Sequence, residues 1–519
     1  MQIKQALISV YDKTGVLEFA KSLSEMGVKI ISSGGTAKTL KNGGVDCVEI
    51  SEVTGFPEIL DGRVKTLNPK IHGGILAKRS DAKHLQELKK HGIEGIDIVV
   101  VNLYPFEDTC AKYYKENSKE ITSEIIENID IGGVALLRAA AKNFNDVIVV
   151  CENADFAQVL EVIKSGNIET AFKAKLAAKA FRHTAYYDSL ISNYFTNEKF
   201  TEKTTIPLKL ISGLRYGENP HQSASLYKLA CADTSKAVAS AIQLQGKELS
   251  YNNYLDMDSA WKLTNEFSEP TCAIIKHNNP CGCASAKDAY NAYLAAYECD
   301  KTSAFGGILA FNVPVDQQTA IETSKIFTEC IIAPVFSDKA IEIFAKKKNL
   351  RILTLPLPDK KTPALEFRQI SGGMLVQDMD TLVSNELKCV TTRQPNANEL
   401  EALKFAWLVC KNVKSNTIVL SRGKRTLGIG AGQMSRIDSL NIAAAKMKAV
   451  KCELNESTFP LVMASDAFFP FPDVVEMAAK IGVKAIIHPG GSIKDADSIE
   501  AANKHGIAMV LTGTRHFRH

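Results

Sequence analysis

Short apolar blocks alternate with longer mixed blocks along the first 150 residues. Residues 5 to 10, 28 to 33, 97 to 106 and 146 to 151 are mainly apolar, and each run predicts a buried strand. The blocks between them, residues 14 to 27, 34 to 42 and 123 to 142, predict helices. Alternating strands and helices predict an α/β fold with a doubly wound parallel sheet, whose ligands bind at the carboxyl ends of the strands.

The rest of the chain continues the pattern after a long helix and a polar segment. Residues 165 to 195 predict the helix, and residues 196 to 207 predict a linker. We therefore expect an N-terminal domain over residues 1–196 and a C-terminal domain over residues 197–519. The strings AIIKHNNP and AIIHPGG are similar, as are TSAFGG and SDAFFPF, although their order along the chain is swapped. This similarity suggests that the C-terminal domain contains two related halves.

Composition and charge narrow the possible partners. The chain has 45% hydrophobic and 23% charged residues, and its net charge is only +4, so no overall field favours nucleic acid. The apolar runs are too short to span a membrane. The 12 cysteines are scattered, and the N-terminus has no signal-like segment, which is typical of reduced thiols in the cytoplasm. We expect a cytoplasmic protein that binds small molecules, with neither nucleic acid nor membrane as a partner.

Polar clusters follow the predicted strands of the N-terminal part. A Gly-Gly-Thr sequence is often only a turn, and the spacing here does not match a Walker A loop. Several polar clusters at the carboxyl ends of one sheet nevertheless favour an anionic, phosphate-bearing ligand. The clusters are Ser9 to Thr14, Ser33 with Gly34, Gly35 and Thr36, Asp61 to Pro69 with Arg63, Lys65 and Thr66, and Asn102 with Tyr104.

The sequence AIIKHNNPCG, residues 273 to 282, is the main candidate in the C-terminal part. The apolar run predicts the end of a buried strand, and Asn-Pro and Cys-Gly predict a turn. Lys276 and His277 would then place a cation beside an imidazole at the rim of a sheet. An ordinary strand end with a satisfied histidine is the simpler alternative.

A zinc site is the first chemical interpretation of this sequence. Zinc deaminases use P-C-x-x-C with an upstream H-x-E, but Cys281 and Cys283 are separated by one residue and no H-x-E occurs upstream. Cys281 as a nucleophile lacks a clear activator other than His277. Acyl or formyl transfer fits better, because His277 can act as the base and Lys276 can stabilise a developing oxyanion.

The chain also resembles a known family over essentially its whole length. The matching strings include SVYDKTG, SSGGTAKTL, DGRVKTLNPKIHGGILA, DIGGVALLRAAAKN, RYGENPHQ, AIIKHNNPCG, SAFGGILAFN, GIGAGQMSRI, SDAFFPF, HPGGSIKD and RHFRH. The family is that of bifunctional purine biosynthesis enzymes, in which AICAR formyltransferase is fused to IMP cyclohydrolase. The resemblance implies a methylglyoxal-synthase-like N-terminal domain and two C-terminal subdomains that resemble cytidine deaminase without its metal.

The resemblance also implies residues for the cyclohydrolase reaction, in which formyl-AICAR closes to IMP with loss of water. Lys142 would be the proton donor or acceptor, with Lys65, Tyr104 and Asp130 around the ring that closes. The implied substrate-binding residues are Tyr11, Asp12, Lys13, Ser33, Gly34, Gly35, Thr36, Arg63, Val64, Lys65, Thr66, Asn102, Asp130 and Ile131.

For the transferase reaction, the resemblance implies that His277 deprotonates the amino group of AICAR and that Lys276 stabilises the transition state. The co-substrate would be 10-formyltetrahydrofolate, with no metal needed, and a homodimer would share its transferase sites. The implied AICAR-binding residues are Arg215, Tyr216, His277, Gly306, Glu329, Asn416, Arg436, Arg515, Phe517 and His519. The implied folate-binding residues are Ile437, Pro470, Asp473, Gly490 and Gly491. The two alternatives are a metal-dependent nucleobase deaminase and a purine-nucleotide-binding protein without turnover.

Overall fold

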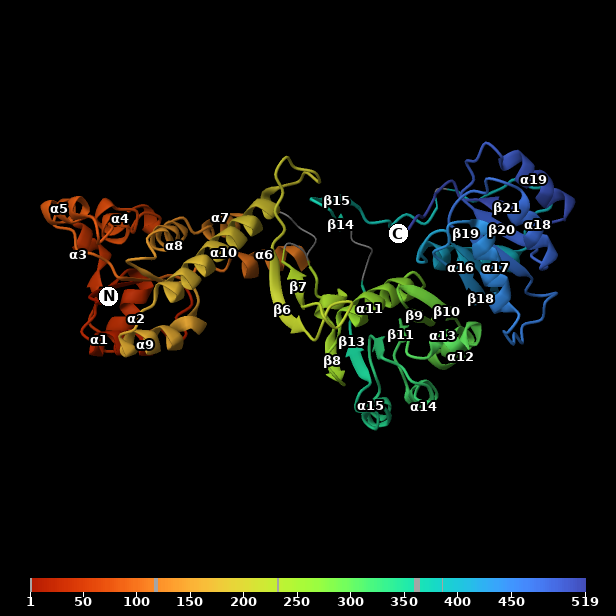
Figure 1. The fold of residues 1–519 in the computed structure, drawn as a ribbon, viewed down its shortest axis with the longest axis horizontal. Coiled ribbons are helices and arrows are strands. Elements are labelled where there is room, and N and C mark those ends of the chain that lie inside the picture. Colours follow the sequence, from red (N-terminus) through yellow and green to blue (C-terminus); the bar gives the residue numbers. More distant parts are fainter. Residues whose placement is uncertain (1, 116–119, 231–232, 359–364, 385) are drawn as a thin grey trace. The chain divides into compact units, whose positions relative to one another are not determined.

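The computed structural model describes residues 2–115, 120–230, 233–358, 365–384 and 386–519. The chain forms two compact units (Figure 1). The first unit contains Met1–Lys209 with Leu229–Asp233, and the second contains Leu210–Lys228 with Thr234–His519. The segment expected to be a linker, residues 196 to 207, lies directly between helix α10 (Thr170–Phe195) and strand β6 (Leu208–Leu214). Strand β6 pairs with β7 (Ala224–Leu229) in a small two-stranded sheet.

A five-stranded sheet with parallel strands forms the centre of the first unit, as the alternation of apolar blocks predicts. Its order is β3-β2-β1-β4-β5. The chain therefore continues from β1 to β2 on one side of the sheet centre and from β4 to β5 on the other side. The carboxyl ends of the neighbouring strands β1 and β4 therefore form the switch point at which such sheets bind ligands. The strands are β1 (Gln5–Ile8), β2 (Lys29–Ser32), β3 (Val48–Glu49), β4 (Ile98–Val100) and β5 (Ile148–Val150).

The helices of the first unit pack on this sheet and contribute to one hydrophobic core. The single helix expected over residues 123 to 142 is two helices, α7 and α8, because Asn128 ends the first and the Asp130 carboxylate accepts the Gly133 amide at the start of the second. Besides α10, the helices are α1 (Val16–Glu25), α2 (Gly34–Asn42), α3 (Ile50–Thr54), α4 (Pro69–Leu76), α5 (Ala82–Lys90), α6 (Phe106–Lys115), α7 (Ser123–Glu127), α8 (Gly132–Lys142) and α9 (Phe156–Ser165), with short 3-10 turns η1 (Leu60–Gly62) and η2 (Asn153–Asp155).

Twelve strands form one mixed sheet in the second unit, and its two halves have the same topology. Outward from the central pair of β10 and β18, one half runs β10-β9-β11-β12-β13-β8 and the other runs β18-β17-β19-β20-β21-β16. The first half contains β8 (Ile242–Gln245), β9 (Thr271–Lys276), β10 (Asn279–Ser285), β11 (Ile308–Phe311), β12 (Cys330–Ala333) and β13 (Arg351–Thr354). The second half contains β16 (Lys388–Cys389), β17 (Ile418–Arg422), β18 (Arg425–Gly430), β19 (Leu461–Ser465), β20 (Ala485–His488) and β21 (Ala508–Leu511).

The two halves have equivalent strand orders, but the strings that correspond are not the ones that the sequence comparison paired. Strand β9, which contains AIIK, is equivalent to β17, whereas the AIIH strand β20 is equivalent to β12. The two similar strings therefore occupy different positions in their halves. Their likeness reflects the shared need for a buried strand, which also explains the swapped order along the chain.

Equivalent helices cover equivalent faces of this sheet. Helices α11 (Tyr251–Thr264) and α16 (Ala397–Lys411) share one hydrophobic core on one face. The remaining helices form two separate cores with the other face. In the first half these are α12 (Ala289–Cys299), α13 (Lys301–Ala304), α14 (Gln317–Thr323) and α15 (Asp338–Ala345). In the second half they are α17 (Arg436–Met447), α18 (Asp473–Lys480) and α19 (Asp495–Lys504). The unit also contains the 3-10 turn η3 (Val238–Ser240) and the hairpin of β14 (Leu365–Ile370) and β15 (Gly373–Asp378).

Close packing of helices on the two central strands explains two glycines. A Cβ at Gly282 of β10 would collide with the Ala296 carbonyl of α12, and one at Gly428 of β18 would collide with the Ala443 carbonyl of α17. The Cys-Gly expected to form a turn is therefore inside strand β10, and that expectation is wrong. The tight turn contains His277 and Asn278 instead.

None of the helices in the described ranges is long and apolar enough to cross a membrane.

A buried ion pair connects the two halves on the α11 and α16 side. The Lys411 ammonium at the end of α16 lies 3.1 Å from the Glu266 carboxylate, and the two side chains are only 5% and 8% exposed. A buried charge that loses its partner is costly, whereas the intact pair contributes little compared with apolar side chains of similar volume.

We therefore expect Lys411→Met to lower the free energy of unfolding by about 3–5 kcal/mol, because the buried Glu266 carboxylate loses the Lys411 ammonium. The double variant Lys411→Met with Glu266→Leu should recover most of this loss. Denaturant unfolding of the three proteins measures both effects, and a double variant no more stable than the single one would contradict this account.

Candidate active sites

The carboxyl ends of β1, β2 and β4 bring the predicted phosphate-binding clusters together. The Asn102 side chain after β4 accepts hydrogen bonds from the Tyr11 and Asp12 amides at 2.6 and 3.1 Å. The Thr36 hydroxyl at the start of α2 donates to the Val10 carbonyl at 2.9 Å. Segments that are far apart in the sequence therefore form one polar edge. Its free amides at the N-terminus of α2 suit an anion.

Two lysines extend over this edge. The position that a Cβ would take on Gly34 lies 3.9 Å from the Lys65 Nζ, and that on Gly35 lies 3.8 Å from the Lys13 Nζ. Both glycines begin α2, so the two cations lie beside exposed helix amides. Two ammonium groups and a helix N-terminus together form a local positive site that the small net charge of the chain does not reveal.

The loop that contains Lys65 has an unusual backbone. Leu60, Asp61 and Gly62 all have positive φ angles, of 56°, 54° and 88°. Non-glycine residues seldom adopt this region, and such strain tends to occur at functional sites. The loop also presents Arg63, which pairs with Glu127, and Val64, whose amide bonds the Ile59 carbonyl.

Asp130 is a half-buried acid next to this loop. Burial raises the pKa of its carboxyl group, while the Gly133 amide, the Lys65 ammonium and the Tyr104 amide act in the opposite direction. The Tyr187 hydroxyl accepts the Asp130 amide at 2.9 Å and so fixes the backbone there. Asp130, Lys65 and Tyr104 are therefore close neighbours, and Thr66 contacts the adjacent Gly132. Ile131, in contrast, is exposed.

Lys142 does not join this group within one chain. It is exposed in the last turn of α8, whereas Asp130 precedes the first turn. Ten residues of helix span about 15 Å. Because α8 leads into parallel strand β5, its last turn lies at the opposite edge of the sheet. In a single chain Lys142 therefore lies away from Asp130, and its expected role as proton donor or acceptor stays a prediction.

In the second unit, the turn between β9 and β10 presents His277 at the surface. His277 and Asn278 have φ angles of 53° and 60°, which is the geometry of a two-residue hairpin turn. The preceding Lys276 donates to the Phe305 carbonyl at 2.9 Å. The adjacent Gly306, with φ of 75°, donates its amide to the Phe327 carbonyl at 2.8 Å.

Glu329 lies at the same edge of the sheet and is held by an arginine. The Arg351 guanidinium, almost completely buried, lies 2.6 Å from its carboxylate. Lys276 is the last residue of β9, Gly306 lies just before β11, and Glu329 directly precedes β12. They lie at the amino ends of β11 and β12, because β9 runs antiparallel to β11.

The second half contributes a cluster of cations and a buried acid to this edge. The Asn416 side chain donates to the Gln433 and Met434 carbonyls at 2.9 and 3.0 Å, just before Arg436 begins α17. The Arg436 guanidinium lies over the Phe468 ring, and burial lowers its pKa. Asp466 is fully buried, and burial raises its pKa against the effects of Ser415, the Thr417 amide and Arg436.

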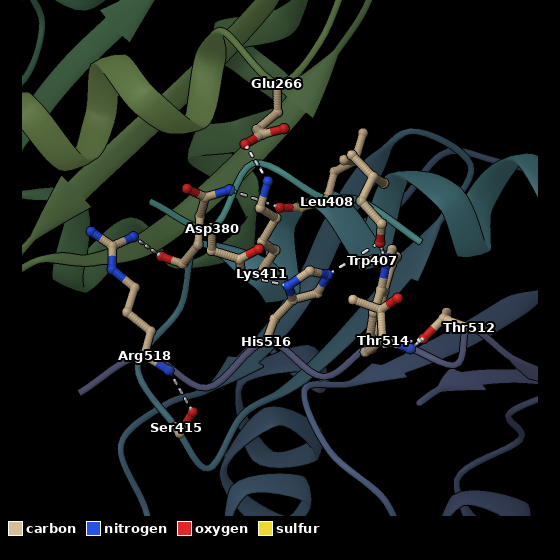
Figure 2. A network of polar contacts seen from close by, with 12 residues as sticks. Glu266, Asp380, Trp407, Leu408, Lys411, Ser415, Thr512, Thr514, His516 and Arg518 are labelled. Atoms are coloured by element: carbon tan, nitrogen blue, oxygen red, sulfur yellow. Dashed lines mark hydrogen bonds and ion pairs between the residues drawn. The ribbon is translucent and has the colours of Figure 1, made fainter. Parts of the chain in front are cut away.

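The C-terminal tail is fixed across the second half (Figure 2). His516 is 1% exposed, its ring packs against Trp407 at a tilted angle, and its Nδ1 lies 2.6 Å from the Asp380 carboxylate. The Arg518 amide donates to the Ser415 hydroxyl at 3.0 Å. These contacts place Arg515, whose guanidinium lies 4.3 Å from the Phe517 ring centroid, and His519 in this region.

The predicted folate residues lie in loops of the second half. Pro470 precedes α18, Asp473 begins that helix, and Ile437 lies in the first turn of α17. Gly490 and Gly491 follow β20 with φ angles of 69° and 95°. Arg215 and Tyr216 lie between β6 and β7, and the Arg215 guanidinium lies over the Tyr216 ring, 5.4 Å from its centroid. The described contacts connect neither residue to the His277 turn or to the cluster around Arg436.

Cys281 and Cys283 are poor candidates for a metal site or a nucleophile. Burial raises the pKa of the Cys281 thiol to about 12 and raises that of Cys283 further. The reactive thiolate form is therefore strongly disfavoured at both positions. In the described part of the chain, no three His, Cys, Asp or Glu side chains gather in a way that could hold a metal ion.

Comparison with known proteins identifies the family. Residues 140–446 match the model of the AICARFT/IMPCHase bienzyme, and residues 15–135 match an MGS-like domain. The chain belongs to the AICARFT/IMPCHase bienzyme family. It is therefore an enzyme of purine biosynthesis with formyltransferase and cyclohydrolase activities on one chain, as the sequence strings predict.

The family relatives match along their full length. A protein of Persephonella marina named bifunctional purine biosynthesis protein PurH is 51% identical over 99% of this chain and all of its own. The protein of the same name from Bacillus subtilis is 50% identical over the whole of both chains. A solved structure titled "Crystal structure of ForH" is 31% identical and covers 38% of this chain and all of its own, but its TM-score of 0.33 adds nothing to the account of the fold.

Three residues near the candidate site of the second unit could not be found by sequence reasoning, namely Asp256, Asp466 and His488. His488 ends strand β20, is fully buried, and packs against the Phe469 ring at 4.5 Å. Its Nδ1 accepts the Gly490 amide at 3.1 Å. Burial, with a smaller effect of Arg436, lowers its pKa to about 3, so the imidazole is neutral at physiological pH.

His488 should make the second unit sensitive to acid. The unfolded chain binds a proton at this residue below about pH 6.5, whereas the folded chain does not until about pH 3, so stability falls as the pH falls through this window. Between pH 6.5 and 5 the loss is about 2 kcal/mol, at about 1.4 kcal/mol per pH unit. His488→Asn, which keeps an acceptor for Gly490, should flatten this dependence in unfolding measurements at several pH values. The exposed His505→Asn should leave it unchanged.

Proposed function

We propose that the chain carries out formyl transfer from 10-formyltetrahydrofolate to AICAR in the second unit and closes formyl-AICAR to IMP in the first. In the transfer, the AICAR amino nitrogen bonds to the formyl carbon and loses a proton to His277. The tetrahedral intermediate then expels the tetrahydrofolate nitrogen, which takes up a proton. The observation that carries this proposal is the fixed turn that presents His277 directly after Lys276.

Lys276 supplies the positive charge in this proposal. Its ammonium group donates to the Phe305 carbonyl in the free protein, so it is ordered before substrate binds. A charge fixed in advance stabilises a developing oxyanion more effectively than one that must first reorient. Glu329, Asn416, Arg436 and Arg515 lie at the same edge and are proposed to bind AICAR, whose phosphate suits the arginines.

For ring closure, Lys65, Tyr104 and Asp130 are the proposed catalytic group of the first unit. The carboxamide nitrogen attacks the formyl carbon, and the resulting carbinolamine loses water, so one group must accept a proton and one must donate. Burial raises the pKa of the Asp130 carboxyl group, which suits a group that takes part in proton transfer. Lys13, the start of α2 and Asn102 are proposed to bind the phosphate and ribose.

We also propose a cytoplasmic homodimer whose transferase sites use residues of both chains. This arrangement would account for Arg215 and Tyr216, which lie apart from both clusters among the described contacts of one chain. It would equally explain an active role for Lys142, since a partner chain could complete what one chain does not. A metal-dependent deaminase is the weaker candidate, because Cys281 and Cys283 lack the P-C-x-x-C spacing and no H-x-E occurs upstream.

Substitutions in the two units should separate the two reactions. His277→Asn tolerates the left-handed turn and should lower formyl transfer by about 10²–10⁴-fold, because the general base is lost. Cyclisation of supplied formyl-AICAR should stay within about twofold of the parent. Tetrahydrofolate release and IMP formation, measured separately, report the two steps.

Lys65→Met should have the opposite effect and slow cyclisation while sparing transfer. The surface variants His505→Asn and Lys29→Met serve as controls and should change neither rate. If either active-site substitution silenced both reactions in a folded protein, the assignment of the two reactions to two units would be wrong.

A further inference from the structure

The backbone of His277 is held in an uncommon conformation by groups outside its own hairpin. His277 and Asn278 are both in the left-handed region, which few non-glycine residues adopt. The imidazole is exposed, so no packing around the ring accounts for its direction. The constraint must come from what binds the turn itself.

Asp256 of α11 binds the turn through both of its amides. One carboxylate oxygen accepts the His277 amide at 3.2 Å, and the other accepts the Asn278 amide at 2.6 Å. These two N–H groups belong to the peptide planes on either side of the His277 Cα. Fixing both planes fixes the φ and ψ angles of His277, and hence the direction in which its side chain leaves the backbone.

Ser259, one helical turn after Asp256, binds the turn at a second point. Its hydroxyl donates to the Asn278 side-chain oxygen at 3.1 Å and accepts a hydrogen bond from the Arg518 guanidinium at 3.2 Å. Arg518 also donates to the Asn412 carbonyl and, through its amide, to Ser415. The turn is thereby connected to the C-terminal tail that contributes to the other cluster of the same edge.

We propose that Asp256 and Ser259 are positioning residues for formyl transfer, which act by fixing the His277 turn. The proposal rests on the proposed function of His277 as the general base. Neither residue hydrogen-bonds the imidazole in the described structure, and both lie on a helix that is capped independently by Ser250 and Asn253. Asp256 is therefore not needed to cap α11, and its two charge-assisted hydrogen bonds stabilise the turn instead.

The first test compares Asp256→Ala with Asp258→Ala on the same helix. Asp258 forms an ion pair with the exposed Lys262 one turn away, at 2.7 Å, and does not hydrogen-bond the turn in the described structure, so it is the matched control. Asp256→Ala should lower the kcat of formyl transfer by about 10- to 100-fold, since a small displacement of a catalytic group has effects of this size. The KM for AICAR and the cyclisation rate should change by less than about twofold. Asp258→Ala should leave all of these unchanged.

A structural readout and a conservative variant accompany the kinetics. Hydrogen exchange of the peptide that spans β9, the turn and β10 should accelerate in Asp256→Ala and not in Asp258→Ala. Asp256→Asn keeps one acceptor oxygen and should recover part of the lost kcat. Ser259→Ala removes only the second contact and should cost about 3- to 10-fold in kcat. It also tests the proposal should Asp256→Ala fail to fold.

A double variant separates this proposal from the assignment of His277. In the His277→Asn background, Asp256→Ala should cause no further loss, because the group that it positions is absent. Losses that multiply in the double variant, or a kcat within twofold of the parent in both Asp256→Ala and Ser259→Ala, would overturn the positioning role while leaving His277 as the base. Full transfer activity in His277→Asn would instead overturn the proposed base.

Discussion

The pairing of β10 with β18 is the contact on which the second unit depends. It joins two halves of equal topology into one sheet, with Ala284 opposite Arg425 in an antiparallel register. Because the join reverses the direction of one half relative to the other, the amino ends of β11 and β12 and the carboxyl ends of β19 and β20 lie at the same edge. Lys276 and Arg436 reach a common region only through this reversal. Gly282 and Gly428 allow α12 and α17 to pack closely on the two joined strands.

Both candidate sites combine fixed positive groups with a carboxyl group whose pKa is raised by burial. In the first unit Lys65 and Lys13 lie beside the half-buried Asp130, and in the second Arg436 lies beside the fully buried Asp466. An anionic substrate is attracted to such a site without any large net charge on the protein. The same burial that prepares these groups for chemistry costs folding free energy, which the extensive apolar cores of the two units offset.

The sequence predicted most elements whose signal is local. The strands and helices of the first unit follow from apolar runs and helical spacing, and the clusters after β1, β2 and β4 converge because the parallel order requires it. The Cys-Gly of β10 was misleading, since glycine in a turn and glycine beneath a closely packed helix look alike in sequence. Lys142 matches a family string, but only the direction of α8 shows that it lies far from Asp130.

Residues that act across the fold could not be predicted in this way. Asp256 lies in a helix 21 residues before the turn that it binds, and nothing in YLDMDSAW distinguishes it from the surface residue Asp258. His488 has no neighbouring sequence signal for burial beyond its apolar strand. In both cases the role depends on tertiary packing, which a single sequence does not encode in any local pattern.

The join between β10 and β18 also determines how the chain must fold during synthesis. About 140 residues separate Ala284 from its partner Arg425, so a ribosome that adds about 5–20 residues per second completes β10 roughly 7–28 s before β18 exists. During that interval β10 is an unpaired edge, which is a hazard for aggregation. Two features of the β10 sequence reduce this hazard. Pro280 offers no N–H to a foreign strand, and the irregular register between Pro280 and Gly282 interrupts a regular template.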